Sequence, residues 1–291
     1  MQTVPQSSDP AAAPVAAPPP QRPWVLKSLP PFPSVAMRLL EVLAQEKLHI
    51  KDVVELVRMD PAFGAEILRL ANSAAYGFRS QIDSLSHAMV LLGTERVRSL
   101  TLTVAMNTYL KRAFRDEDLR ACWHHSLATA FLSGTLAAPA SMNMDRAYTA
   151  GLLHDVGRLA LLAGYPVEYS NLIAVANENH LDIMAVERGM FDIDHAEAGR
   201  WLADEWRFPT ELRDVIATHH LADPKGRLTL AAVIGLACRL AAILGFGVIR
   251  PLRDACYEDV LRDIPENLRA GLPEETTLRE RIERKVNAFA G

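Results

Sequence analysis

The chain has 291 residues, of which 49% are hydrophobic and 23% are charged, and its formal net charge is −4. These values are typical of a globular protein with a sizeable core, built as one large domain or two small ones. The acidic balance argues against a dedicated nucleic-acid-binding protein, and the sequence has no basic stripe and no aromatic–basic interleaving.

The sequence also argues against a membrane or secreted protein. No apolar run reaches the roughly 18–20 residues that a spanning helix needs. The first basic residue is Arg22, and no apolar stretch typical of a secretion signal follows it. Three widely spaced cysteines, Cys122, Cys238 and Cys256, form neither a CxxC pair nor a disulfide framework. We therefore expect a cytoplasmic protein in a reducing compartment, away from the membrane.

The hydrophobic pattern predicts helices and no strands. Residues 1–23 are rich in Pro and Ala, and we expect them to be a disordered tail. From Trp24 onward apolar residues recur at helical spacing, and no segment alternates with the period of two that a strand needs. Asp60 and Pro61 are typical of a helix start. The helices are expected at 33–45, 59–77, 84–93, 94–111, 119–137, 145–164, 169–180, 195–206, 209–220, 228–247 and 276–289. The pattern predicts an all-α fold, a multi-helix bundle.

The segment AYTAGLLHDVGRLALLAG, residues 147–164, places His154 and Asp155 inside a strongly apolar helical run. Buried polar groups need partners, because an unpaired buried charge is costly. Four more histidines flank this run in helical contexts: His125, His195, His219 and His220. A metal in a helical bundle needs imidazole and carboxylate groups from several helices. Because neighbours on a helix point about 100° apart, His154 and Asp155 can share an ion only in a crevice between helices.

Two interpretations of these residues stay open. A mononuclear or dinuclear metal site would activate water for attack on a phosphoester. The alternative is structural, since an isolated His–Asp dipeptide in a helix usually caps a neighbouring helix or bonds a backbone carbonyl. The residues alone favour the structural interpretation.

The order of motifs resembles a known superfamily. WHHS, LLHDVGRL, DHAEAG and THH resemble the HD superfamily of metal-dependent phosphohydrolases. Upstream, LPPFPSVAMRLLEVL, LVRMDPAFGAEILRLANSAAYG and IDSLSHAMVLLGTERVRSLTL resemble the HDOD family, the HD-related output domain, so that the likeness covers about residues 26–245. It implies an HDOD domain at 24–222, with an N-terminal helical lobe at 24–115 packed on an HD-like lobe at 116–222. Residues 223–291 would complete that lobe and add an amphipathic tail helix.

The resemblance also implies site residues. It assigns one metal to His125, His154 and Asp155. A second metal is assigned to three further histidines by similarity to the cyclic-di-GMP phosphodiesterase branch: His195, His219 and His220. The metal would be Fe, Mn or Zn. Asp155 and Arg158, the latter as a phosphate clamp, are the candidate catalytic residues.

Two features depart from the superfamily pattern. Cys238, in LACRLA, stands where the last Asp ligand is expected, in a context like LADRLA. A thiolate is a soft ligand among hard ones, and a small buried core residue is the favoured interpretation of Cys238. The GYP segment that should follow the HH pair is absent, and Arg158 replaces a lysine with different phosphate-binding geometry.

We therefore expect a bacterial regulatory module of HDOD type without catalytic activity, which binds signalling proteins or a small ligand and is compatible with a homodimer. The loop at 72–84 carries a candidate contact surface at Tyr76, Phe78 and Arg79, although an ordinary connection between helices is favoured. The alternative is a metal-dependent phosphohydrolase acting on a nucleotide or cyclic dinucleotide. A metal held without turnover, as a structural staple or a sensor, is a third hypothesis.

Overall fold

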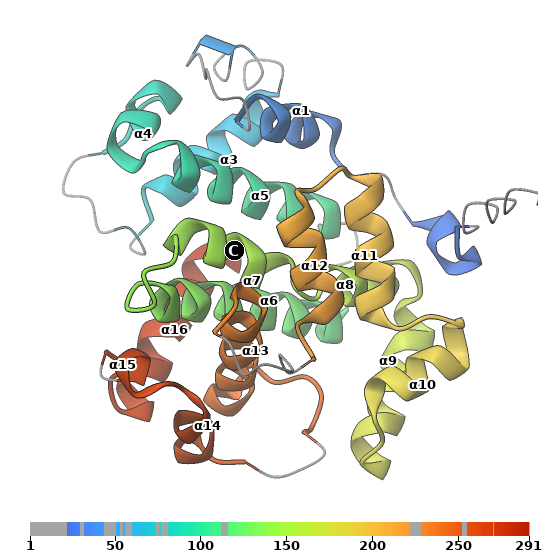
Figure 1. Ribbon diagram of the computed structural model, residues 1–291. Helices are drawn as coiled ribbons and strands as arrows, with labels where there is room; N and C mark the ends of the chain where they lie inside the picture. The colour runs from blue at the N-terminus through green and yellow to red at the C-terminus, as the bar shows by residue number, and fades with distance from the viewer. Residues whose placement is uncertain are drawn as a thin grey trace, which may run out of the picture.

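The computed structural model shows an all-α protein, as the periodicity predicts (Figure 1). Its helices are joined by turns, and the described residues contain no strand. The residues that the structure describes are 22–29, 32–43, 51–52, 55, 60–73, 76, 81–111, 116–221, 228–251, 255–269 and 271–290. Nearly all of the predicted N-terminal tail therefore lies outside the described residues.

Helices α1, α3, α4 and α5 gather above the rest of the molecule in Figure 1, whereas the short helix η1 lies apart from them and packs against α8. Helix α5 packs against α1, α3 and α4. Asp60 caps α3 by accepting a hydrogen bond from the Phe63 amide at 3.0 Å. Gly93, at φ 80°, lets the chain pass from α4 directly into α5, a backbone angle that L residues rarely adopt. The bounds of these elements are η1 Trp24–Ser28, α1 Ser34–Leu43, α3 Pro61–Ala71, α4 Leu85–Leu92 and α5 Thr94–Leu110.

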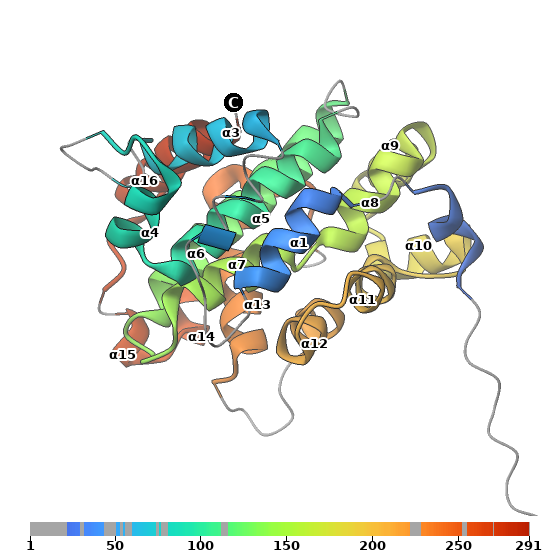
Figure 2. The same cartoon turned by 90° about the horizontal axis from the view of Figure 1, so that it is seen from above.

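Helix α6 is the centre of the second half of the molecule. It packs against α7, α8, α13 and α16 and is buried along most of its length. In the view of Figure 2, α11 and α12 lie side by side at one edge, and α8 packs against α11 on the inner side. These elements are α6 Glu117–Ala137, α7 Met144–Leu153, α8 Val156–Gly164, α9 Pro166–Asn179, α10 Ile183–Phe191, α11 His195–Glu205 and α12 Thr210–Thr218.

The contact between α8 and α11 is unusually close. A Cβ atom built on Gly157 would lie 2.0 Å from the carbonyl oxygen of His195 and 2.4 Å from the amide nitrogen of Gly199. Only a residue without a side chain fits at this crossing. The main chains of α8 and α11 are therefore in direct contact beside the His154–Asp155 pair.

The C-terminal helices complete the same core. They are α13 Leu230–Ala241, the π-helical turn η2 Ala242–Phe246, α14 Tyr257–Asp263, α15 Glu266–Arg269 and α16 Glu275–Ala290. Phe289 of α16 packs its ring 5.2 Å from that of Phe131 in α6, and its carbonyl oxygen accepts a hydrogen bond from Asn107 of α5 at 3.1 Å. One hydrophobic cluster runs from Val25 to Phe289.

Two predicted helices are interrupted. The segment 145–164 breaks at His154–Asp155, where α7 ends and α8 begins, because a continuous helix would direct these two side chains about 100° apart. The break lets both polar groups face one crevice. The segment 228–247 leaves α-helical geometry in η2, where Gly245 has a φ of 95°. Such π-helical turns occur frequently at functional sites.

Within the described residues, no single helix is long and apolar enough to cross a membrane. One bent pair of helical segments, Met144–Gly164 with Pro166–Asn179, is long and apolar enough to do so by length and composition alone.

Candidate metal centre

The structure brings the predicted site residues together from five packed segments. His125 lies on α6, His154 ends α7, Asp155 precedes α8 and His195 begins α11. The remaining members follow α12 or lie on α13: His219, His220 and Cys238. His154 and His195 are fully buried, Asp155 is 2% exposed, and His220 is the exposed member.

These side chains form two sets of ligand atoms. The His125 group consists of His125, His154 and Cys238, and the Asp155 group consists of Asp155, His195, His219 and His220. Within each group, one ligand atom per residue lies within 4.8 Å of all the others. This division differs from the one that the resemblance implies, because Asp155 joins the second set and Cys238 completes the first. The reason is packing: Asp155 starts the helix that contacts α11, whereas α13 carries Cys238 against α6.

Three of the imidazoles are oriented by backbone carbonyl groups. The Nδ1 atom of His125 bonds the Phe246 carbonyl at 3.1 Å, and that of His154 bonds the Gly151 carbonyl at 2.7 Å. His219 does the same with Ile216 at 2.9 Å. Because a carbonyl oxygen can only accept, each Nδ1 carries the hydrogen, and in the neutral ring Nε2 has a free lone pair. Metal-binding histidines are typically held in this way.

Three buried acceptors in the centre have no hydrogen-bond partner among the described residues. They are Nε2 of His154, Nε2 of His219 and Oδ1 of Asp155. Burial lowers the pKa of His154 to about 3 and that of His125 to about 4, so both rings are neutral at pH 7. Oδ1 of Asp155 lies 3.4 Å from Nε2 of His219, but that nitrogen carries no hydrogen in the neutral tautomer that the Ile216 carbonyl selects. An unpaired buried acceptor costs about 1–3 kcal/mol. A cation would satisfy them, so these residues fit a divalent metal ion.

Asp155 is compensated by a permanent positive charge. Nη1 of Arg158 lies 3.0 Å from Oδ2 of Asp155, and Nη2 lies 3.2 Å from Nε2 of His195. Burial would raise the pKa of Asp155, but the Arg158 guanidinium and the neighbouring histidines outweigh that effect and hold the pKa well below its usual range. The carboxylate is therefore ionised, with one oxygen paired to Arg158.

Glu187 on α10 is a site residue that the sequence analysis missed. Its fully buried carboxylate accepts hydrogen bonds from the amide of His195 at 2.9 Å, from Nδ1 of His195 at 2.7 Å and from the hydroxyl of Tyr169. Nε2 of His195 lies 2.8 Å from Nε2 of His220. His195 therefore has partners at both ring nitrogens without an ion. The sequence signal that could have revealed it is its spacing: Glu187 is four residues from Ile183 and four from Phe191, so it lies on the buried face of α10.

The candidate contact residues of the loop at 72–84 are only partly described. The ring of Tyr76 lies 6.0 Å from the ring of Phe289, and the Arg96 guanidinium lies 5.8 Å from its centroid. Tyr76 thus packs against the C-terminal helix. Phe78 and Arg79 lie outside the described residues.

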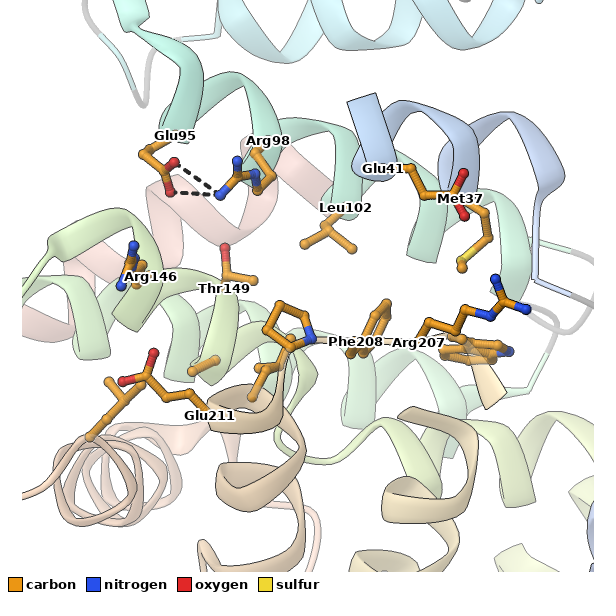
Figure 3. Close-up of a pocket in the computed structure, with 15 residues that line it drawn as sticks. Met37, Glu41, Glu95, Arg98, Leu102, Arg146, Thr149, Arg207, Phe208 and Glu211 are labelled. Carbon is orange, nitrogen blue, oxygen red and sulfur yellow. Dashed lines mark hydrogen bonds and ion pairs between the residues drawn. The ribbon is translucent and has the colours of Figure 1, made fainter. Parts of the chain in front are cut away.

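A separate pocket of about 350 Å³ lies where α1 and α5 face α7 and α12 (Figure 3). Leu102 and Phe208 point into it, and the ion pair between Glu95 and Arg98 borders it. Its described lining residues include no member of the histidine groups. Helix α12 connects the two places, because its Glu211 lines the pocket and its C-terminal end is followed by His219 and His220.

Comparison with known proteins identifies the family. The model of the HDOD domain matches residues 29–222. The chain belongs to the HDOD family. The matched segment holds both histidine groups except Cys238, and α13 follows it.

Solved structures share the fold of this HDOD protein. A Shewanella amazonensis SB2B protein named "Putative phosphohydrolase" is 24% identical, with a TM-score of 0.70 over 92% of this chain and 97% of that one. A Marinobacter aquaeolei VT8 protein named "Putative signal transduction protein" is 21% identical, with a TM-score of 0.70 over 90% of this chain and 60% of that one. An HDOD domain protein from Geobacter sulfurreducens is 22% identical, with a TM-score of 0.65 over 90% and 91%.

A curated relative is an uncharacterized protein of Treponema pallidum (strain Nichols), which is 24% identical over 197 residues. The match covers 67% of this chain and 38% of the relative.

Proposed function

We propose that this HDOD protein is a signal-transduction module whose buried histidine cluster binds one divalent metal ion and does not hydrolyse phosphoesters. Cys238 replaces the last carboxylate ligand of the superfamily pattern, which argues against hydrolysis at a single ion, and the observation that carries the proposal against a dinuclear site is the position of Arg158 between Asp155 and His195. A two-metal hydrolytic site needs a second ion close to these ligands. The guanidinium is 3.0 Å from the carboxylate and 3.2 Å from the imidazole, so a positive charge already lies there.

Electrostatics argue strongly against a second ion beside that guanidinium. Two unit charges of the same sign repel by about 4 kcal/mol when they are 4 Å apart at an effective dielectric constant of about 20, and a divalent ion doubles this value. Arg158 is buried and paired with Asp155, so it cannot easily turn toward solvent. We infer that the guanidinium takes over the charge balance that a second metal supplies in a dinuclear enzyme.

A single ion is supported by the rest of the cluster. The unpartnered acceptors on His154, His219 and Asp155 call for a cation, and the carbonyl-bound Nδ1 atoms leave the ring lone pairs directed away from the backbone. The ligands come from segments far apart in the sequence. An ion held by them would fix the arrangement of these helices and add to the stability of the fold.

The signalling part of the proposal rests on the link between the cluster and the surface. Helix α12 lines the pocket at one end and leads into His219 at the other. A ligand or partner protein that moves α12 would therefore change the ligand geometry of the cluster. The name of the Marinobacter relative points in the same direction.

The test combines metal content, stability and turnover. Tag-free protein purified without chelators is analysed by inductively coupled plasma mass spectrometry, and thermal unfolding is compared before and after chelation. Hydrolysis of bis(p-nitrophenyl) phosphate and of cyclic dinucleotides is then measured with manganese, iron or zinc. We expect about one metal ion per chain, a higher melting temperature with metal and no turnover.

Two variants make the result specific. His154→Ala should lose the metal, whereas His124→Ala, on the neighbouring and less buried histidine, should keep it. Hydrolysis that disappears in His154→Ala would replace the proposal with the phosphohydrolase hypothesis. Absence of metal under all conditions would leave the histidines as structural residues and overturn the proposal.

A further inference from the structure

Cys238 lies inside the cluster and not merely beside it. Its Sγ atom is 3.4 Å from Nε2 of His125, and together with His154 the two residues form the His125 group. The other two cysteines are not in either ligand group: Cys122 is buried elsewhere on α6, and Cys256 is exposed ahead of α14. Only one of the three thiols therefore faces the candidate metal centre.

We propose that the metal is zinc and that its protein ligands are Nε2 of His125, Nε2 of His154 and the thiolate of Cys238. This inference rests on the proposed function, because it names the ion and the ligands of the same centre. Binding converts the thiol to a zinc-bound thiolate and releases its proton to solvent. Three protein ligands leave the fourth position of a zinc tetrahedron to water, so the turnover assay of the proposed function also tests whether this water reacts.

The distance between sulfur and nitrogen agrees with this assignment. Zinc bonds are about 2.3 Å to sulfur and about 2.0–2.1 Å to nitrogen. Two such ligands at a tetrahedral angle are about 3.6 Å apart, close to the 3.4 Å between Sγ of Cys238 and Nε2 of His125. These two atoms therefore need little movement to bind one ion, and a ligand nitrogen of His154 lies within 4.8 Å of both. The same distance suits a thiol–imidazole hydrogen bond, so the experiment has to distinguish the two.

The donor set selects against the metals of a hard site. Manganese prefers carboxylate, carbonyl and water ligands, whereas a thiolate with two imidazoles suits zinc. An aspartate at position 238 would provide the hard ligand that the superfamily pattern contains, and the cysteine removes it. The Asp155 group is a less suitable site, because the guanidinium of Arg158 lies against His195 there.

Cobalt(II) substitution tests the sulfur ligand directly. Metal-free protein is titrated with Co²⁺, and absorption is recorded from the near ultraviolet to the visible. We expect a sulfur-to-cobalt charge-transfer band together with visible d–d bands. Cys238→Ser should lose the charge-transfer band, and its zinc affinity, measured by competition with a chromophoric chelator, should fall more than tenfold. Cys256→Ser, at an exposed cysteine, should match the unmodified protein.

A second variant and a second method keep the test independent of folding. Cys238→Asp should lower the preference for zinc over manganese. X-ray absorption at the zinc edge of the unmodified protein should detect one sulfur neighbour at about 2.3 Å.

Four results would overturn the inference. Cobalt bound without a charge-transfer band, or zinc without a sulfur neighbour, would assign the metal to the Asp155 group and leave the proposed function intact. Unchanged zinc affinity in Cys238→Ser would have the same meaning. Failure of zinc, cobalt and manganese alike to bind would overturn both the inference and the proposed function.

Discussion

The two ligand groups differ in how their polar atoms are satisfied. In the His125 group the backbone fixes the rings, and no charged side chain belongs to the group. In the Asp155 group the guanidinium of Arg158 pairs with Asp155, and a second buried carboxylate, that of Glu187, holds His195. The first group offers only neutral side chains to an ion, whereas the second already holds a guanidinium against its carboxylate and one of its imidazoles. The two groups, which lie next to each other in one protein, therefore satisfy their buried polar atoms in different ways.

The largest expected effect follows from removing the internal counter-charge. Arg158→Met would leave the buried carboxylate of Asp155 without its main partner, and breaking a buried ion pair in this way costs about 3–5 kcal/mol. Urea-induced unfolding of metal-free protein measures the loss. Arg200→Met, which removes an arginine from exposed ion pairs with Asp204 and Asp214, should cost at most about 1 kcal/mol. Equal losses in the two variants would show that Arg158 does not compensate Asp155.

The His125 group should make metal-free protein sensitive to acid. Burial lowers the folded-state pKa of His125 to about 4, below the value of about 6.5 in the unfolded chain. The unfolded state therefore binds more protons below pH 6.5, and stability falls as the pH decreases from there toward 4. The contribution of His125 reaches about 3 kcal/mol at the acid end.

A comparison of variants isolates that histidine from the carboxylates that titrate nearby. The unfolding free energy is measured from pH 7.5 to pH 4 for the unmodified protein and for His125→Gln. The variant should show a shallower decline, because its side chain does not titrate. His124→Gln provides the control, since that ring is on the same helix but less buried. Parallel curves for the protein and His125→Gln would contradict the prediction.

The smallest effect concerns the contact that holds the Asp155 group together. Gly157→Ala would force α8 away from α11, since the new Cβ would overlap main-chain atoms, and such overpacking costs about 1–3 kcal/mol. Gly189→Ala on α10 meets no atom within 4 Å and should stabilise the protein by up to about 1 kcal/mol. Thermal unfolding of the two variants should therefore shift in opposite directions. A neutral Gly157→Ala would mean that the helices can separate freely.

The helical fold was predictable because apolar residues recur at the helical period along nearly the whole chain. The convergence of the histidines was expected from the order of motifs, and the structure brings those residues together. The break at His154–Asp155 was not predictable from periodicity, because the apolar pattern continues through it. Short helices such as α10, α14 and α15 were also not assigned in advance.

The residues that contact the predicted histidines were harder to predict than the histidines themselves. Glu187 is 18 residues from Tyr169 and 8 residues from His195 in the sequence, but only the packing of α10 against α9 and the start of α11 brings its carboxylate to them. Cys238 was interpreted as a core residue because a lone cysteine in an apolar helix usually is one. Its distance to His125 depends on how α13 lies on α6, and sequence spacing does not encode that.

The π-helical turn after α13 extends the buried centre toward the outside of the protein. Its last residue, Phe246, holds the ring of His125 through its carbonyl oxygen. Two and four residues later, Val248 and Arg250 are hydrogen-bonded through their main chain to the side chain of Asn177 on α9. A displacement of the His125 ring would have to pass along only five residues of main chain to reach α9, whose Val175 is 45% exposed. The turn therefore joins the buried ring of His125 through the main chain to a helix at the surface.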